Sequence, residues 1–105
     1  MAVDVYRVSE SLPKAEMYGL TSQVRRAAVS VDSNIAEGQG RLTKGEFTHF
    51  LGQARGSLLE LETQLEIALD LSFVSQAEFN RLCEQFSEVR RLLNGLIESV
   101  RASNK

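Results

Sequence analysis

Hydrophobic residues recur at steps of three and four over most of the chain, the spacing that gives an α-helix one apolar face. The longest such stripe predicts a helix over residues 44–71 and consists of Phe47, Leu51, Ala54, Leu58, Leu61, Leu65 and Ala68. A second stripe predicts a helix over residues 76–101 and consists of Phe79, Leu82, Phe86, Val89, Leu93, Leu96 and Val100. The connection Ser72 to Ser75 is so short that these two helices must pack side by side and antiparallel.

Both long helices begin with the same two local signals. A capping box joins a Ser or Thr to a Glu three residues later, and a hydrophobic staple joins the apolar residues on either side of that cap. The first helix has the box Thr43 with Glu46 and the staple Leu42 with Phe47. The second has the box Ser75 with Glu78 and the staple Val74 with Phe79. These signals fix where both helices begin.

Two further helices are predicted upstream. One covers residues 20–37 and is expected to end at Gly38 in a left-handed conformation. The other covers residues 2–11, before Pro13, and is too short to be stable unless it docks on the rest. The expected fold is an all-α, antiparallel up-and-down four-helix bundle with a short first helix, formed by residues 1–105 as a single domain. Its expected central residues are Leu51, Leu58, Leu65, Phe86, Val89 and Leu93.

Composition narrows the function classes. The 105 residues carry 12 Lys and Arg against 14 Asp and Glu, a net charge of -2, so no overall positive field favours nucleic acid. One cysteine and one histidine exclude an internal disulfide and leave little for a zinc site. No segment indicates secretion or membrane spanning, so the cytoplasm is the expected location.

Candidate catalytic residues are few. We expect His49 to be a surface or interface histidine and Cys83 a small core residue. Glu60, Glu62 and Glu66 lack the Glu-x-x-His pairs of di-iron bundles and are expected to form a solvated face. No nucleophile, base, metal or cofactor site is expected, and an enzyme is therefore disfavoured. Gly52 and Gly56, within a helix, are expected to allow a neighbouring backbone to approach closely.

The basic residues offer one candidate binding surface. Arg25, Arg26, Arg41, Lys44 and Arg55 form the only sizeable group, and the alternatives of phosphate contact and surface solubility remain open. A further pair of structural polar residues lies beside the Gly38 turn. Asn34 and Glu37 either face solvent or hydrogen-bond the following loop and fix its path.

A family resemblance rests on three segments. They are YGLTSQVRRAAVSVDSNIAEGQGR from Tyr18, EFTHFL from Glu46 and ARGSLLELETQLEIA from Ala54. The chain resembles the bacterial four-helix bundle proteins, which include the 23S rRNA intervening-sequence proteins and the accessory variability proteins of diversity-generating retroelements. The resemblance implies an up-down bundle without catalytic activity, commonly a homopentameric ring, and the retroelement members bind nucleic acid and associate with a reverse transcriptase through a basic surface.

Two departures from the family pattern change these expectations. Only twelve residues precede Pro13, so the first helix is shorter than is usual in the family, and Asp32 stands where the family often has a proline. Asp keeps its backbone N–H, so no kink is expected there.

Apolar residues outside the main stripes predict a subunit interface: Phe50, Leu59, Leu69, Cys83, Leu92 and Ile97. The leading hypothesis is a non-enzymatic homo-oligomeric scaffold, for which the resemblance implies a pentamer, that binds RNA, DNA or a reverse transcriptase; the alternative is a protein–protein adaptor.

Overall fold

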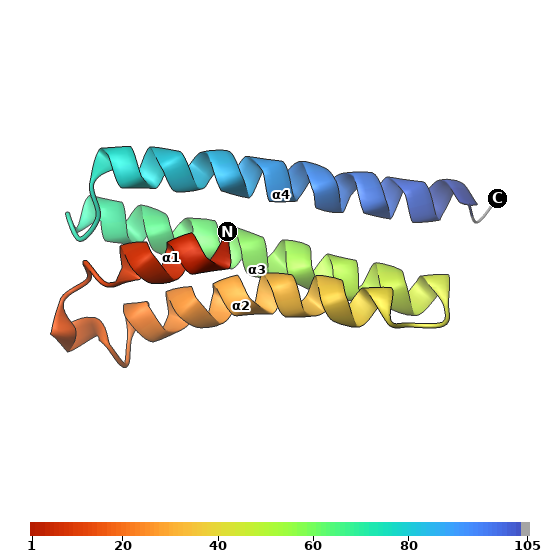
Figure 1. Cartoon of the computed structure of the whole chain (residues 1–105), viewed down its shortest axis with the longest axis horizontal. Coiled ribbons are helices and arrows are strands. Elements are labelled where there is room, and N and C mark those ends of the chain that lie inside the picture. The colour runs from red at the N-terminus through yellow and green to blue at the C-terminus, as the bar shows by residue number, and fades with distance from the viewer. Residues whose placement is uncertain (104–105) are drawn as a thin grey trace.

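The computed structural model describes residues 1–103 and contains only helices among them (Figure 1). The elements are α1 (Ala2–Ser9), the 3-10 turn η1 (Lys14–Glu16), α2 (Leu20–Gln39), α3 (Lys44–Asp70) and α4 (Gln76–Ser103). The predicted all-α four-helix fold with a short first helix is confirmed. Boundaries differ by up to two residues: α1 is shorter than predicted, while α2 and α4 each extend two residues further.

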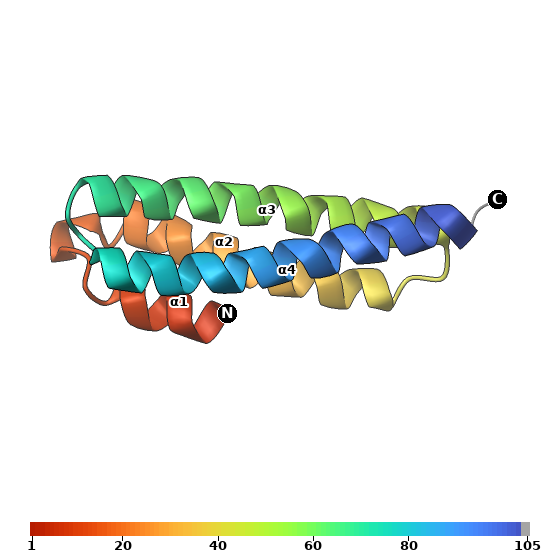
Figure 2. The ribbon, with the colours of Figure 1, turned by 90° about the horizontal axis from the view of Figure 1, so that it is seen from above.

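The long helices form an antiparallel series in which α3 is the middle member. The helices α2 and α4 both pack along α3, and α1 packs on α2 and α4 at the end where α2 begins. Figures 1 and 2 show that the N-terminus lies near the middle of the bundle's length, so α1 covers only part of it. An 8-residue α1 spans about 12 Å, against about 40 Å for the 27 residues of α3. The far half of the molecule therefore consists of three helices.

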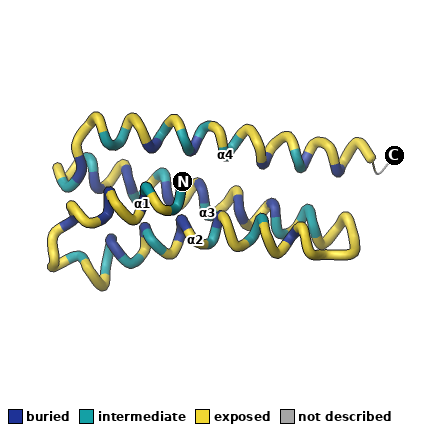
Figure 3. The backbone as a smooth tube through the Cα atoms, in the orientation of Figure 1, coloured by how far each residue is buried: buried dark blue, intermediate teal, exposed yellow. Residues whose placement is uncertain are grey.

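The core lies along the inner faces of the helices, as the alternating bands in Figure 3 show. Leu51, Leu58, Leu65, Phe86 and Leu93 are buried, as predicted from the stripes. Val89 is only partly buried and packs against this core from its edge, so its predicted central position is wrong. The spacing of the stripe shows which side of the helix is apolar, but it does not show which apolar residues lie at the edge of the core.

Both predicted caps form, but one of the two predicted staples does not. The Glu46 amide donates to Thr43 Oγ1 at 3.1 Å, and Ser75 and Glu78 bond reciprocally at 3.1 and 3.2 Å. Val74 is buried in the core. Leu42 is 100% exposed, so the predicted staple with Phe47 is wrong.

The predicted role of Gly38 also needs correction. The helix α2 continues through Gly38 to Gln39, and its cap Gly40 has a right-handed φ of -84°. A Cβ added at Gly38 would lie 3.0 Å from the Phe47 ring and 3.1 Å from Phe50 Cβ. Gly38 therefore lets α3 approach α2 closely. The Phe47 ring packs against Gly38 and not against Leu42.

Two glycines of α3 behave in the opposite way. A Cβ added at Gly52 or Gly56 would meet nothing within 4 Å, and both residues are exposed. The prediction that they admit a neighbouring backbone is therefore wrong within this chain. Because α3 packs its neighbours only through its apolar stripe, the glycines on its other side face open space.

The packing predicts a large stability effect for one core residue. Leu58 is 1% exposed, so Leu58→Ala should lower the free energy of unfolding by about 2 to 5 kcal/mol, because it removes buried apolar contacts and leaves a cavity. The matched control is Leu42→Ala, which should change it by less than about 0.5 kcal/mol. Chemical denaturation measures both, and similar effects for the two variants would contradict this packing.

Candidate functional site

The five basic candidates do not form one patch. Arg25 and Arg26 lie in the first third of α2, whereas Arg41 and Lys44 lie at the α2–α3 turn at the other end. Sixteen residues separate Arg25 from Arg41, which corresponds to about 24 Å along a helix. Arg55 lies part-way along α3. The structure therefore divides the predicted cluster into separate positions.

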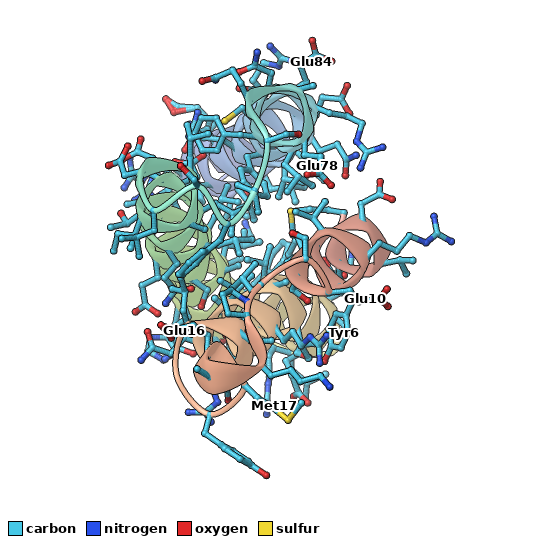
Figure 4. The ribbon with its side chains drawn as sticks, turned by 90° about the vertical axis from the view of Figure 1, so that its left-hand side faces the viewer. Tyr6, Glu10, Glu16, Met17, Glu78 and Glu84 are labelled. Carbon is cyan, nitrogen blue, oxygen red and sulfur yellow. The ribbon has the colours of Figure 1, made fainter. Side chains whose placement is uncertain are left out.

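Arg25 fixes α1 to α2. Its Nε donates to Ser9 Oγ at 2.8 Å, and its guanidinium lies 5.0 Å from the centre of the Tyr6 ring. On the other side of α1, Gln85 donates to Asp4 Oδ2 at 2.7 Å, and this hydrogen bond lowers the pKa of the Asp4 carboxyl. Arg25 thus has a structural role. Figure 4, which views the bundle from this end, shows Tyr6 on the side of α1 nearest α2.

Arg26 is exposed and borders a polar hollow of about 440 Å³ between α2 and α3. The Ser30 and Ser57 hydroxyls bond across its floor at 2.8 Å. The other lining residues are Gln23, Ala27, Glu60 and Gln64. The hollow could not be predicted from the sequence because its two sides come from different helices, and the two serines are 27 residues apart along the chain.

The α2–α3 turn brings Arg41 and Lys44 together around a hollow of about 270 Å³. Arg41 Nη2 donates to Glu37 Oε2 at 3.0 Å, and its guanidinium lies 4.6 Å from the centre of the Phe50 ring. Glu37 therefore contacts the loop, one of the two alternatives left open. Asn34 does not, since its Nδ2 donates to the Ser30 carbonyl at 2.8 Å within its own helix.

The last turn of α4 also lies at this end of the bundle. Lys44 Nζ donates to the Ser103 carbonyl at 2.8 Å, which places the last turn of α4, with the exposed Arg101, beside the start of α3. Because the last two helices are antiparallel, the sequence indicates that the end of α4, which carries Arg101, lies near the start of α3. Arg55 is directed elsewhere, and its Nη1 donates to Asn94 Oδ1 of α4 at 3.2 Å.

The remaining reactive side chains are dispersed. His49 is exposed and hydrogen-bonded to Gln53 at 3.1 Å. Cys83 is partly buried, and burial, with a contribution from the nearby Glu66, raises the pKa of its thiol. Glu62 pairs with Arg90. Among residues 1–103 no group of three or more His, Cys, Asp or Glu is arranged to hold a metal ion, and no helix of this part is long and apolar enough to cross a membrane.

The apolar residues outside the stripes have different environments. Leu59 is 56% exposed and Leu92 54% exposed, as an interface prediction requires. Ile97 is only 4% exposed and belongs to the core, so it is unavailable to a partner. The other three, Phe50, Leu69 and Cys83, are partly buried.

The contacts of Arg25 predict that its substitution destabilises the fold more than the same substitution at Arg26. Arg25→Gln should lower the free energy of unfolding by about 1 to 3 kcal/mol, because it removes a charged hydrogen bond and a cation–π contact that hold α1. Arg26→Gln makes the same charge change one residue away and should have an effect below about 0.5 kcal/mol. Thermal and chemical denaturation of both variants measure the difference, and equal effects would contradict the role of Arg25.

Comparison with known proteins agrees with this architecture. A crystal structure of a protein of unknown function from the S23 ribosomal protein family of Bacteroides thetaiotaomicron superposes with a TM-score of 0.84 and 21% identity, over 91% of this chain and 90% of that one, which shows a shared fold. No curated protein matches the chain. The profile of the 23S rRNA-intervening sequence proteins matches residues 1–95, so the chain belongs to that family.

Proposed function

We propose that the protein is a non-enzymatic, homo-oligomeric scaffold of the cytoplasm that binds nucleic acid through the α2–α3 end of the bundle. The observation that carries this proposal is the meeting of Arg41, Lys44 and the α3 N-terminus around one hollow, with the last turn of α4 beside it. The first turn of a helix offers backbone N–H groups without intrahelical partners and the positive end of a dipole. Together with the basic side chains, this is the chemistry that holds a phosphate.

Opposing charges limit the strength of a single contact. Glu37 already pairs with Arg41, and Glu46 lies in the first turn of α3. A phosphate would have to compete with the Glu37 carboxylate for the guanidinium. Binding by one chain should therefore be weak, and assembly of several chains would supply the missing affinity through multivalency.

Assembly as a homopentamer is part of the proposal. The resemblance to the ring-forming bundle proteins supports it, as does the exposed Leu92 on α4. A ring would repeat the α2–α3 end once per subunit. The same resemblance supports a nucleic-acid enzyme, such as a reverse transcriptase, as a further partner of this end.

The second candidate is a protein–protein adaptor without nucleic-acid binding. It is favoured by the internal contacts of four of the five predicted basic residues, all except Arg26. These contacts and the net charge of -2 reduce the charge available to a phosphate backbone. The two candidates are distinguished by the binding measurement below.

We expect sequence-independent binding to RNA or DNA that weakens steeply with salt, because phosphate contacts release counterions. Fluorescence anisotropy with a labelled single-stranded RNA and a DNA duplex, at about 50 and 200 mM salt, measures it. Combining Arg41→Gln with Lys44→Gln should lower both the affinity and the salt slope.

The control makes the same charge change at a distance from the turn. Arg7→Gln combined with Arg91→Gln alters exposed residues of α1 and α4 and should leave most of the binding intact. Equal losses for both double variants would mean only a general charge effect. No wild-type binding at about 50 mM salt would contradict the scaffold proposal and favour the adaptor instead.

Assembly has its own measurement. Light scattering should give about 58 kDa for a ring of five 11.7 kDa chains. Leu92→Glu should abolish ring-sized species and leave the chain helical by circular dichroism, because the leucine is exposed within a chain and a buried unpaired charge is costly at an interface. A wild-type mass of 11.7 kDa would contradict the proposal.

A further inference from the structure

A hollow of about 250 Å³ lies where α1, the loop that follows it and the start of α2 meet. Its apolar lining comes from Leu12, Pro13 and Met17. Glu10 and Met17, which both line it, are labelled in Figure 4 at this end of the bundle. An apolar cavity of about 150 Å³ holds one benzene molecule, so this hollow has room for a ligand of about one ring or one short branched chain.

The two buried polar residues of the described part of the chain, Ser9 and Thr21, both line this hollow. Ser9 Oγ is satisfied, since it donates to the Tyr6 carbonyl at 2.7 Å and accepts from Arg25 Nε at 2.8 Å. Thr21 is only 7% exposed, yet its hydroxyl has no hydrogen-bond partner among residues 1–103. Buried hydroxyls are normally hydrogen-bonded, because an unpaired one is costly.

The Thr21 hydroxyl is also reachable from outside the chain. Gln64 Oε1 is the one side-chain polar atom of the described residues that is both sealed from solvent and unbonded. The Thr21 hydroxyl is unbonded but not sealed, and Thr21 lines the hollow. The hollow is therefore where a partner for this hydroxyl would lie.

The charge around the hollow favours an anion. Lys14 and Arg25 contribute two positive charges to its lining and Glu10 one negative charge. Lys14 and Glu10 form no ion pair within residues 1–103, whereas Arg25 is held in place by its bond to Ser9. The 20-residue α2 begins here without a side-chain cap, so the positive end of its dipole adds to this field.

We propose that this hollow binds a small organic acid. The carboxylate accepts hydrogen bonds from the Thr21 hydroxyl and the Lys14 ammonium, and its apolar body lies against Leu12, Pro13 and Met17. A carboxylate only accepts hydrogen bonds, so it suits two donors beside a helix N-terminus. Apolar walls with a few converging polar groups are typical of small-molecule sites, and they distinguish an organic acid from an inorganic anion, which has no apolar part.

The position of the hollow gives the ligand an effect on the fold. Its walls come from α1, the loop and α2, so a bound acid joins the short α1 to the rest of the bundle. An 8-residue helix is not stable alone, and a ligand that binds only the docked form stabilises it. The site lies at the opposite end of α2 from the α2–α3 turn, so it is independent of the proposed nucleic-acid binding.

Thr21→Val tests the unpaired hydroxyl without any ligand. Valine nearly keeps the shape of threonine, so the loss of an unpaired hydroxyl should leave the melting temperature unchanged or raise it. The control is Ser9→Ala, which removes a buried hydroxyl that is bonded within the chain and should lower the melting temperature. A lower melting temperature for Thr21→Val as well would mean that its hydroxyl has a partner in the chain, and this would overturn the proposal.

Binding is measured by NMR titration of the full chain with benzoate and with 4-methylpentanoate, one aromatic and one branched acid. At least one of them should shift the amide signals of residues 12–14 and 21–25 saturably, with half-saturation below about 5 mM. Benzamide keeps the ring but not the charge and should bind about tenfold more weakly than benzoate, if benzoate is the acid that binds. Thr21→Val and Lys14→Gln should each weaken binding about three- to tenfold.

The matched control is Arg91→Gln, which removes one positive charge from an exposed residue of α4 and should leave acid binding unchanged. An equal loss for Lys14→Gln and Arg91→Gln would mean only a general charge effect and would overturn the proposal. It would equally be overturned if neither acid bound saturably at about 20 mM, or if Thr21→Val bound as tightly as the wild type. None of these outcomes bears on nucleic-acid binding at the α2–α3 end.

Discussion

The apolar stripe of α3 holds the bundle together. The helices α2 and α4 each pack along it, and the short α1 packs on both of them. A helix packed on two sides must carry a wide apolar face, and the buried residues of α3 recur at every turn from Leu51 to Ala68. The hydrophobic effect stabilises this arrangement in proportion to the apolar area removed from water. Because it has no direction, it does not fix the exact positions of the helices.

Close approach and polar contacts then set the geometry. Gly38 allows the Phe47 ring to reach α2 at the turn, and Arg25 and Gln85 hold α1 from two sides. Because α1 is short, these few contacts must position it. These glycine and polar contacts form only in the folded chain, and they set where each helix lies.

The use of basic residues inside the fold bears directly on function. Arg25 is committed to α1 and Arg55 to α4, so neither presents a freely available charge. The α2–α3 end keeps Arg41 and Lys44 close together, with a carboxylate partner on one and a helix carbonyl on the other. A site of this kind binds weakly alone and gains from repetition, so assembly and ligand binding are linked in the proposed scaffold.

Local sequence signals were sufficient to predict the helices and most of the core. The spacing of Leu51, Leu58 and Leu65 fixes which side of α3 is buried, and the capping residues Thr43 and Ser75 fix where helices begin, because both signals are local. The family resemblance drawn from sequence was also correct for the 23S rRNA-intervening sequence proteins.

How residues far apart along the chain meet depends on the packing of the helices against one another. This packing separated the basic candidates along α2 and α3, placed the last turn of α4 beside Lys44, and buried Ile97 while leaving Leu42 in water. It also reversed the roles of the glycines, since Gly38 is packed tightly and Gly52 faces open space. Helical period gives the direction of a side chain around its own axis, but the neighbour in that direction depends on the lengths and positions of the other helices.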